Sequence, residues 1–272
     1  MKVNPPAYKI IRPHEYLLPI LLSVPHSGTL FPENLHKDFD QKHLQYPDDT
    51  DWFVDQLYDF APELGITMIV AQYSRYVVDL NRDPTGRPLY EDGRAITQLV
   101  PTHTFFGQPL YPQVIPTDED IQLRKELYFY PYHLQLREEL QRLQQTFPDV
   151  LLWDAHSIRQ SIPTIREDPF PDLILGNQNG CSASSELIST AVTHLSEDKS
   201  YDFCENDPFK GGYITRYYGN PQQGIHALQL EMAKSLYMDE ETSTYIPDCA
   251  DKIRAILIKT LTALASQLKI QI

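Results

Sequence analysis

The sequence predicts one α/β domain over residues 1–272, a doubly wound α/β/α sandwich with a mostly parallel or mixed sheet. Two observations support this prediction. Several apolar runs lack the alternation of a half-exposed strand, which is typical of strands that helices bury on both faces. Segments with apolar residues at helical spacing lie between these runs, and strands that alternate with helices favour this architecture. The 22 prolines are spread along the chain and mark no single linker.

The predicted strands are short apolar runs, several of which end at polar residues. His26 follows the first run and His156 follows the fourth. In chain order the predicted strands are residues 17–24, 67–71, 76–80, 150–153, 173–176 and 225–230. Residues 83–117 are too long for a plain connection and are expected to cover one end of the sheet. Sites in open α/β sheets form beyond the carboxyl ends of strands, so these polar residues are the candidates for a site.

Four helices are expected around these strands. Asp49 or Thr50 can cap the first. Thr117 begins a long second helix that Pro131 should kink or split. Ser184 precedes the third, and an amphipathic fourth helix at the C-terminus should pack on the sheet. Their apolar faces comprise, in order, Phe53, Leu57, Phe60 and Leu64; Leu123, Leu127, Leu134, Leu140 and Leu143; Leu187, Ile188, Ala191 and Leu195; and Ile253, Ile256, Leu257, Leu261, Leu264 and Leu268.

The composition argues against several classes of partner. The chain has 23 Lys and Arg against 37 Asp and Glu, a net charge of −14, which disfavours binding to nucleic acid or to an anionic membrane. No run is apolar and long enough to span a bilayer, and no signal-peptide pattern is present. The three cysteines lack metal-site spacing and are typical of a reduced protein. We expect a cytoplasmic monomer or small homo-oligomer whose partner is a small molecule.

Two histidines and a carboxylate are candidate metal ligands. His26 and His156 each follow an apolar run, which would place both imidazoles at the same sheet edge. A catalytic zinc commonly has three protein ligands, often two His and one carboxylate, and one open position. Asp51 is the preferred third ligand, while Asp49 is the alternative or a helix cap. Each signal alone also fits an ordinary buried histidine or a capping acid, but their order along one sheet favours a metal site.

Asn81 and Arg82 end the third apolar run and are candidates for binding a carboxylate. An arginine presents a planar pair of donors that matches a carboxylate, and an asparagine amide adds one more donor. A second cation, Arg216, follows a glycine pair that includes Gly212, where the backbone can approach a ligand closely. An acidic substrate would need such a local group of cations, because the net charge of the chain repels it.

Glu231 ends the last predicted strand and is a candidate proton carrier. Burying an unpaired carboxylate is costly, so such a residue is either paired or functional. Beside an activated water it could accept a proton and later deliver it to a leaving amine. An ion pair with one of the arginines is the alternative, and the residue by itself does not decide between them.

Together these motifs resemble the N-formylglutamate amidohydrolase family over nearly the whole chain. Six stretches match in the same order, residues 24–28, 49–52, 74–82, 152–158, 209–216 and 228–231. The order is also similar, more distantly, to that of the zinc carboxypeptidases and aspartoacylase, which implies a zinc-carboxypeptidase-like fold. One departure is visible, because those relatives carry the first His and the carboxylate in a short His-x-x-Glu motif, whereas Asp51 lies far downstream of His26.

The resemblance implies hydrolysis of N-formyl-L-glutamate to formate and L-glutamate, a step of histidine degradation. It implies Zn²⁺, or another divalent transition metal, as one ion per chain bound by His26, Asp51 and His156. Two alternatives remain open. One is another zinc deacylase or carboxypeptidase that acts on an acidic N-acyl amino acid, and the other is a non-catalytic protein that binds acidic ligands.

The resemblance also implies roles for the remaining candidates. Glu231 would act as general base and then general acid, and Arg75 would stabilise the oxyanion of the tetrahedral intermediate. Asn81 and Arg82 would bind one carboxylate of a dianionic substrate, and Arg216 would bind the other.

Overall fold

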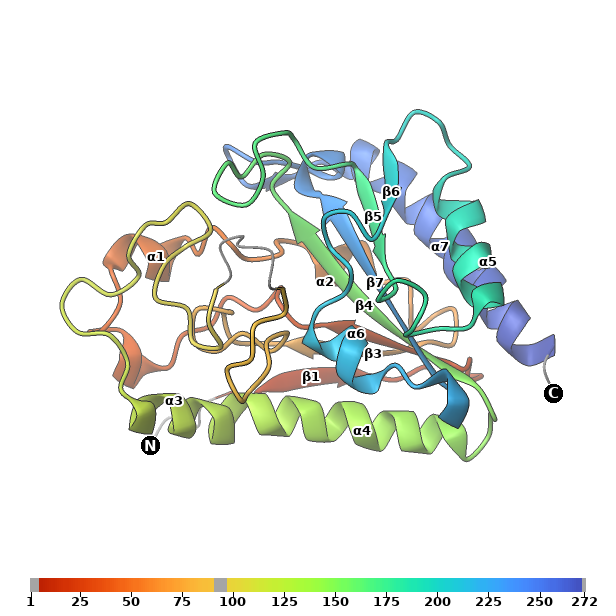
Figure 1. The fold of residues 1–272 in the computed structure, drawn as a ribbon, viewed down its shortest axis with the longest axis horizontal. Coiled ribbons are helices and arrows are strands. Elements are labelled where there is room, and N and C mark those ends of the chain that lie inside the picture. The colour runs from red at the N-terminus through yellow and green to blue at the C-terminus, as the bar shows by residue number, and fades with distance from the viewer. Residues whose placement is uncertain (1–4, 91–96, 271–272) are drawn as a thin grey trace.

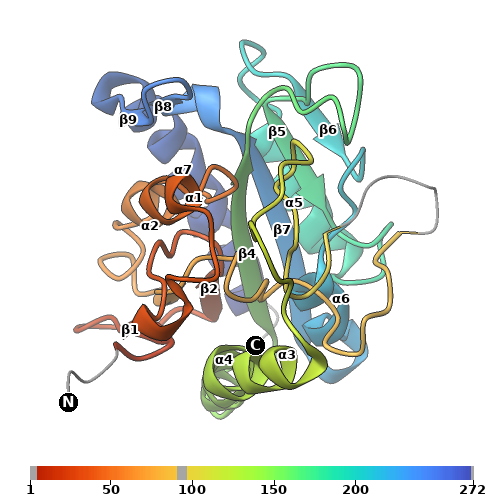
Figure 2. The same ribbon diagram turned by 90° about the vertical axis from the view of Figure 1, so that its left-hand side faces the viewer.

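A mixed sheet forms the centre of the protein, with helices on both of its faces (Figures 1 and 2). The computed structural model describes residues 5–90 and 97–270. The strand order is β1-β3-β2-β4-β7-β5-β6. These strands are β1 (Tyr8–Ile11), β2 (Ile20–Val24), β3 (Thr67–Ala71), β4 (Val150–Ile158), β5 (Leu173–Gly176), β6 (Phe203–Glu205) and β7 (Ile225–Ala233), and a separate pair comprises β8 (Met238–Asp239) and β9 (Thr244–Tyr245). The predicted α/β sandwich is confirmed.

The inner strands of the sheet pair in parallel. β2 pairs with β3 and β4, and β4 pairs with β7. β1 and β5 run antiparallel to their inner neighbours, β3 and β7, which makes the sheet mixed. In the register of β4 and β7, Asp154 lies beside Gln229 and His156 lies beside Glu231. The centre of the sheet therefore presents two neighbouring pairs of polar side chains.

Most predicted strands are present, with changes at their ends. β3 and β5 have the predicted bounds, whereas β2 begins only at Ile20. β4 and β7 are longer than their apolar runs, so His156 and Glu231 lie within strands and not beyond them. Sequence reasoning missed β1 and β6, which are short outer strands without a fully buried run, and the two-residue strands β8 and β9.

Helices cover the two faces of the sheet in separate groups. α5 and α7 pack together on one face, while α4 and α6 lie against the other (Figure 1). As predicted, Thr117 caps α3 in a capping box with Asp120, and Ser184 caps α5. The described helices are α1 (Gln41–Gln45), α2 (Val54–Leu57), α3 (Asp118–Arg124), α4 (Tyr130–Gln144), α5 (Ser185–Leu195), α6 (Tyr213–Tyr218) and α7 (Pro247–Ile270), with 3₁₀ turns at Glu33–Leu35, Pro221–Gln223 and Lys234–Leu236.

The long second helix is interrupted before Pro131. One π-helical turn, Lys125–Phe129, separates α3 from α4. The single apolar face predicted for this helix does not form, because Leu140 and Leu143 are buried while the earlier leucines are about half exposed. The exposed ones are Leu123, Leu127 and Leu134. Leu134 precedes Leu140 and Leu143 in α4 itself, and at 3.6 residues per turn this spacing places Leu134 on the other side of the helix.

Residues 76–80 do not form the predicted strand but a buried segment of turns. The Asp79 carboxylate accepts a hydrogen bond from the backbone N–H of Asn81 at 2.8 Å. Such a local bond stabilises a turn and competes with the strand that the apolar pattern favours. The carboxylate is thereby placed at the end of the sheet, next to His26.

The helix predicted after Asp49 is shorter than expected. α2 starts at Val54, after Phe53, whose backbone has a φ of 62°. Neither Asp49 nor Thr50 caps it, and Asp51 precedes the helix. The Asp49 carboxylate instead accepts a hydrogen bond from the backbone N–H of Phe105 at 2.9 Å. The acidic run is therefore a loop that connects β2 and α2 to the segment around Phe105.

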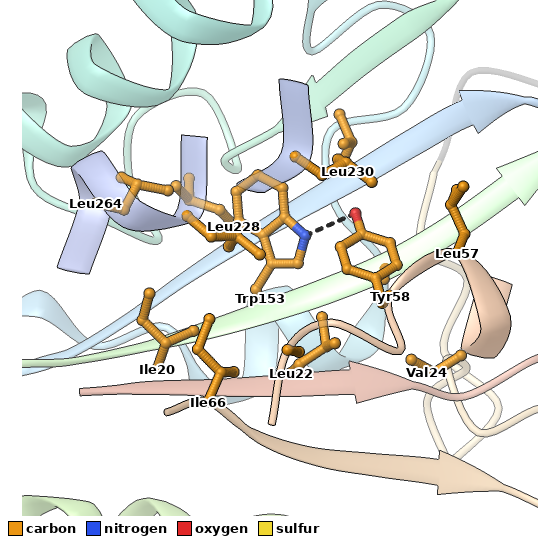
Figure 3. Close-up of a cluster of buried hydrophobic side chains, with 14 of the residues drawn as sticks. Ile20, Leu22, Val24, Leu57, Tyr58, Ile66, Trp153, Leu228, Leu230 and Leu264 are labelled. Carbon is orange, nitrogen blue, oxygen red and sulfur yellow. Dashed lines mark hydrogen bonds between the residues drawn. The ribbon is translucent and has the colours of Figure 1, made fainter. Parts of the chain in front are cut away.

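The core on the α5 and α7 side is built around Trp153 (Figure 3). Its indole Nε1 donates a hydrogen bond to the hydroxyl of Tyr58 at 3.0 Å, and both side chains are fully buried. Side chains alternate along a strand, so Trp153 on this face places Asp154 and His156 on the opposite face. In the part of the chain that the structure describes, no helix combines the length and apolar character needed to cross a membrane.

Candidate active site

A small pocket lies on the sheet face opposite Trp153, with a cavity volume of about 90 Å³. Most of the predicted site residues line it. These are His26, Arg75, Asn81, Arg82, His156, Gly212 and Glu231. Residues from the long segment after β3 complete the wall, among them Thr97 and Phe105. That segment therefore covers the site, as the sequence predicts, although residues 91–96 lie outside the described part of the chain.

Three predicted ligands, His26, Asp51 and His156, converge at the base of this pocket. The Nδ1 atoms of the two histidines are 3.2 Å apart. Asp51 Oδ2 lies 3.1 Å from His156 Nδ1 and 3.7 Å from His26 Nδ1. All three side chains are buried, with exposed fractions of 1–3%. The structure thus brings the two histidines together with Asp51, the preferred third ligand. Asp49, the alternative, instead bonds to the backbone of Phe105.

A second carboxylate orients each histidine. His26 Nε2 lies 2.8 Å from Asp79 Oδ1, and His156 Nε2 lies 2.8 Å from Asp154 Oδ2. This arrangement favours a proton on each Nε2, which leaves both Nδ1 lone pairs directed at the same point. Carboxylate–histidine pairs of this kind commonly support metal-binding histidines.

The donor atoms fit a metal cation. Two imidazole lone pairs and a carboxylate oxygen repel one another unless positive charge lies between them. In addition, Asp51 Oδ1 is buried without a hydrogen-bond partner, although Arg75 Nη1 lies 3.5 Å away. Two histidines and one carboxylate form a ligand set that suits Zn²⁺. These groups can therefore hold one divalent ion.

The electrostatics of the cluster also favour positive charge there. Burial opposes the charged form of His156, but Asp154 and Asp51 outweigh it and raise the pKa of the imidazole well above its ordinary value. Burial likewise opposes ionisation of Asp51, yet hydrogen bonds with His156 and His26 hold the pKa of its carboxyl below the ordinary range. A proton or a metal ion is stabilised at this point by the same surroundings.

Glu231 lies beside the cluster and has a raised pKa. It is 8% exposed, and its Oε2 accepts a hydrogen bond from Gln229 Nε2 at 3.1 Å. Burial is the main cause that raises the pKa of its carboxyl to about 7, with Asp51 adding to the effect and His156 opposing it. Among the described residues Glu231 forms no ion pair with a lysine or arginine, so the ion-pair interpretation finds no support there.

The two arginines of the pocket differ in their partners. Arg75 Nη2 donates to Asp79 Oδ2 at 2.7 Å, and its guanidinium lies 4.7 Å from the centre of the Phe105 ring. Arg82 lies farther from the same acid, 3.9 Å from Asp79 Oδ2, and donates to the backbone carbonyl and the hydroxyl of Thr97. Burial lowers the pKa of Arg82, while Asp79 opposes the shift. Arg82 Nη1 also donates to the carbonyl of Asn81 at 3.1 Å, so Arg82 differs from Arg75 in its longer contact with the acid and not in having fewer hydrogen bonds.

Both ends of the Asn81 amide form hydrogen bonds with other residues of the protein. Its Nδ2 donates to Asp154 Oδ2 at 3.1 Å, and its Oδ1 accepts from the backbone N–H of Ile214 at 2.7 Å. A Cβ on Gly212 would lie 2.3 Å from Asn81 Nδ2, so glycine is required there for close packing. The close approach that the glycine permits is to Asn81. Direct substrate contacts by Asn81 and Gly212 stay predictions.

Arg216 lies outside the pocket wall. Its Nε donates to the carbonyl of Gly211 at 2.8 Å, and its Nη1 donates to the carbonyl of Leu89 at 2.7 Å. The guanidinium lies over the ring of Tyr90, 4.9 Å from its centre. Leu89 and Tyr90 line the pocket, so Arg216 supports that wall. A direct contact of Arg216 with substrate stays a prediction.

Sequence reasoning did not assign orienting roles to Asp79, Asp154 and Gln229. Asp154 and Gln229 each stand two positions before a predicted residue, His156 and Glu231, and side chains two apart share a strand face. That spacing is a signal that could have found both. No such spacing marks Asp79, because its contact with His26 depends on a turn at a place where the apolar pattern predicts a strand.

A polar site near the carboxyl ends of the central strands of a mixed sheet is typical of α/β enzymes. The family model for N-formylglutamate amidohydrolase matches residues 18–238. The chain belongs to this family.

Proteins of known name and structure agree with this assignment. The chain is 42% identical to an N-formylglutamate deformylase of Pseudomonas putida over 94% of its length and 96% of the relative. It is 40% identical to one of Pseudomonas aeruginosa, covering 91% of this chain and 92% of the relative. The crystal structure of an N-formylglutamate amidohydrolase from Ralstonia eutropha JMP134 superposes with a TM-score of 0.80 at 25% identity, covering 98% of this chain and 99% of that chain.

Proposed function

We propose that this protein hydrolyses N-formyl-L-glutamate to formate and L-glutamate with the help of a divalent metal ion. The observation that carries the proposal is the convergence of His26, Asp51 and His156 beside the buried carboxylate of Glu231. The names of the Pseudomonas relatives, N-formylglutamate deformylases, supply the substrate. Amide hydrolysis requires an activated water, stabilisation of a developing oxyanion and a proton for the leaving amine.

His26, Asp51 and His156 are the residues that would hold the metal. When bound, a divalent ion such as Zn²⁺ would polarise the formyl oxygen and acidify water. Asp79 and Asp154 would keep the two imidazoles turned with Nδ1 toward the ion, which is supported by their 2.8 Å contacts to the Nε2 atoms.

Glu231 is the proposed proton carrier. Its carboxylate would accept a proton from the attacking water and then deliver it to the nitrogen of glutamate as the C–N bond breaks. Its burial and a pKa near 7 support this role, because a group that both accepts and releases a proton works best near the ambient pH. Its place beside His156 in the strand register keeps it next to the proposed metal ligands.

Arginine side chains are the proposed anchors for the acidic substrate. Arg82 is best placed to bind a carboxylate, because it lines the pocket and its contact with Asp79 is long. Arg75 is the proposed oxyanion-stabilising cation, and its 2.7 Å contact with Asp79 keeps it in place. Arg216 remains the proposed second anchor. Its contacts with Leu89 and Tyr90, which line the pocket, support this proposal.

A substrate panel tests the proposal. Purified protein supplied with Zn²⁺ is assayed with N-formyl-, N-acetyl- and N-succinylglutamate and with N-formylaspartate. We expect the highest kcat/KM for N-formylglutamate, with release of formate and glutamate in equal amounts. A higher kcat/KM for an acetyl or succinyl substrate would instead favour another deacylase of acidic N-acyl amino acids.

A further inference from the structure

Gln229 is a buried residue of the pocket wall, and the reaction proposed above assigns no role to its amide. It lies on β7 two residues before Glu231, so both side chains project from the same face of the strand. Its Oε1 accepts a hydrogen bond from the backbone N–H of Gly212 at 2.7 Å. Its Nε2 donates to Glu231 Oε2 at 3.1 Å. The amide thus connects the start of α6 to the proposed proton carrier.

The orientation of the Gln229 amide is fixed by its two partners. A backbone N–H can only donate, so the amide atom that faces Gly212 must be the oxygen. The NH₂ group then faces Glu231, whose ionised carboxylate can only accept. A flipped amide would place two donors against each other at Gly212 and an oxygen against the carboxylate. Gln229 therefore offers Glu231 one donor in one direction.

Gly212, whose backbone N–H bonds to the Gln229 oxygen, is itself held in place. A Cβ on Gly212 would collide with the Asn81 side chain, and in the first turn of α6 the backbone N–H of Ile214 donates to Asn81 Oδ1. Asn81 in turn contacts Asp154, which orients His156. Movement of Gly212 relative to the proposed metal ligands is therefore restricted.

We propose that Gln229 is a positioning residue for Glu231, an inference that rests on the proposed function. A glutamate side chain has several rotatable bonds, and Glu231 has no ion pair among the described residues that could hold it. The bond from Gln229 fixes Oε2 and leaves Oε1 as the oxygen that exchanges a proton with water and with the leaving nitrogen. Catalysis depends on such fixed geometry, because small displacements of a reacting group are costly.

Two other roles give different results in the same experiment. Gln229 lines the pocket and could contact the substrate directly, or it could merely stabilise the fold. The variant Gln229→Met keeps the length of the side chain and removes both hydrogen bonds. It is measured alone and combined with Glu231→Gln, since a residue that acts only through Glu231 has no effect once Glu231 cannot carry a proton.

We expect Gln229→Met to lower kcat by roughly 10- to 100-fold, the scale of a displaced catalytic group, with little change in KM, metal content or Tm. In the Glu231→Gln background it should cause no further loss. The exposed Gln222→Met serves as the matched control and should leave kcat unchanged. If Gln229→Met is insoluble, Gln229→Asn, which is too short to span both partners, is subjected to the same comparison.

The inference is overturned if Gln229→Met lowers kcat/KM by the same factor in both backgrounds, or if its effect lies in KM alone. The first result indicates a structural role and the second a contact with substrate. Normal turnover in Glu231→Gln by itself would refute the proton-carrier role in the proposed function. Failure of the inference and failure of that function are therefore distinguishable.

Discussion

Asp79 lies between His26 and Arg75 and contacts both, with its Oδ1 2.8 Å from His26 Nε2 and its Oδ2 2.7 Å from Arg75 Nη2. Burial opposes the charge on this carboxylate, but Arg75, Arg82 and His26 hold its pKa well below the ordinary range. One ionised acid thus orients a proposed metal ligand and a proposed oxyanion-stabilising cation. The proposed metal site and the proposed substrate pocket share this support.

The first prediction is that Asp79→Asn weakens metal binding. An amide cannot supply the negative charge that favours the Nε2–H form of His26, and loss of such a partner typically weakens metal affinity by about 10- to 100-fold. Competition of the purified variant with a metal chelator measures the change. The exposed Glu138→Gln removes a charge from α4, outside the pocket wall, and serves as control. An Asp79→Asn affinity equal to that of the wild type would show that this contact does not tune the metal site.

Gly212→Ala should damage both stability and activity. The added Cβ would lie 2.3 Å from Asn81 Nδ2, and overpacking of this kind costs about 1–3 kcal/mol. The displaced Asn81 would also lose its contact with Asp154. Thermal unfolding and kcat/KM are measured for Gly212→Ala, Asn81→Ala and the double variant. If the collision with Asn81 is the cause, the double variant is no worse than Asn81→Ala alone, whereas additive losses would point to a different cause.

His133 should make the stability of the protein depend on pH. It lies between the hydroxyl of Tyr218 and the carbonyl of Leu80, and burial is the main cause that lowers its pKa to about 4. In the unfolded chain the His133 imidazole is protonated below about pH 6.5, whereas in the folded protein it is protonated only below about pH 4. The contribution of neutral His133 is therefore complete above pH 6.5 and is lost as pH falls toward 4, by about 3 kcal/mol.

The variant His133→Gln isolates this contribution, because glutamine can keep a donor and an acceptor but does not titrate. Urea unfolding at a series of pH values gives the free energy of unfolding of both proteins. The advantage of the wild type over the variant should shrink as pH falls from 7 to 4. Parallel curves over this range would show that His133 is not the titrating group.

Arg82→Lys should reduce binding of an acidic substrate. The variant keeps the positive charge but loses the planar pair of donors, and should cost about 1.5–3 kcal/mol of transition-state binding. kcat/KM for N-formylglutamate measures this loss, and the exposed Arg137→Lys is the matched control. Equal kcat/KM for Arg82→Lys and the wild type would remove Arg82 from the list of substrate anchors.

The regular parts of this fold are predictable because local pattern and tertiary packing agree there. β3 and β5 are continuous apolar runs that stay buried in the sheet, and Thr117 and Ser184 cap helices through side chains that reach only a few residues along the chain. The convergence of His26 and His156 likewise follows from parallel strands whose carboxyl ends meet at one edge.

The remaining features depend on contacts between distant parts of the chain. The apolar run at residues 76–80 resembles a strand, yet Asp79 bonds to the backbone of Asn81 and turns the segment toward His26. The role of Gln229 arises only where Gly212 approaches it. No residue-type preference predicts the π turn before α4. These features require three-dimensional packing to be seen.

Formate release with and without metal tests the central claim most directly. The protein is treated with a chelator, assayed with N-formyl-L-glutamate and then resupplied with Zn²⁺, alongside His156→Ala. The account predicts one bound ion per chain, loss of formate release on chelation, recovery with about one equivalent of metal, and neither tight binding nor recovery in His156→Ala. Undiminished formate release from metal-free protein, or full metal binding and activity in His156→Ala, would contradict it.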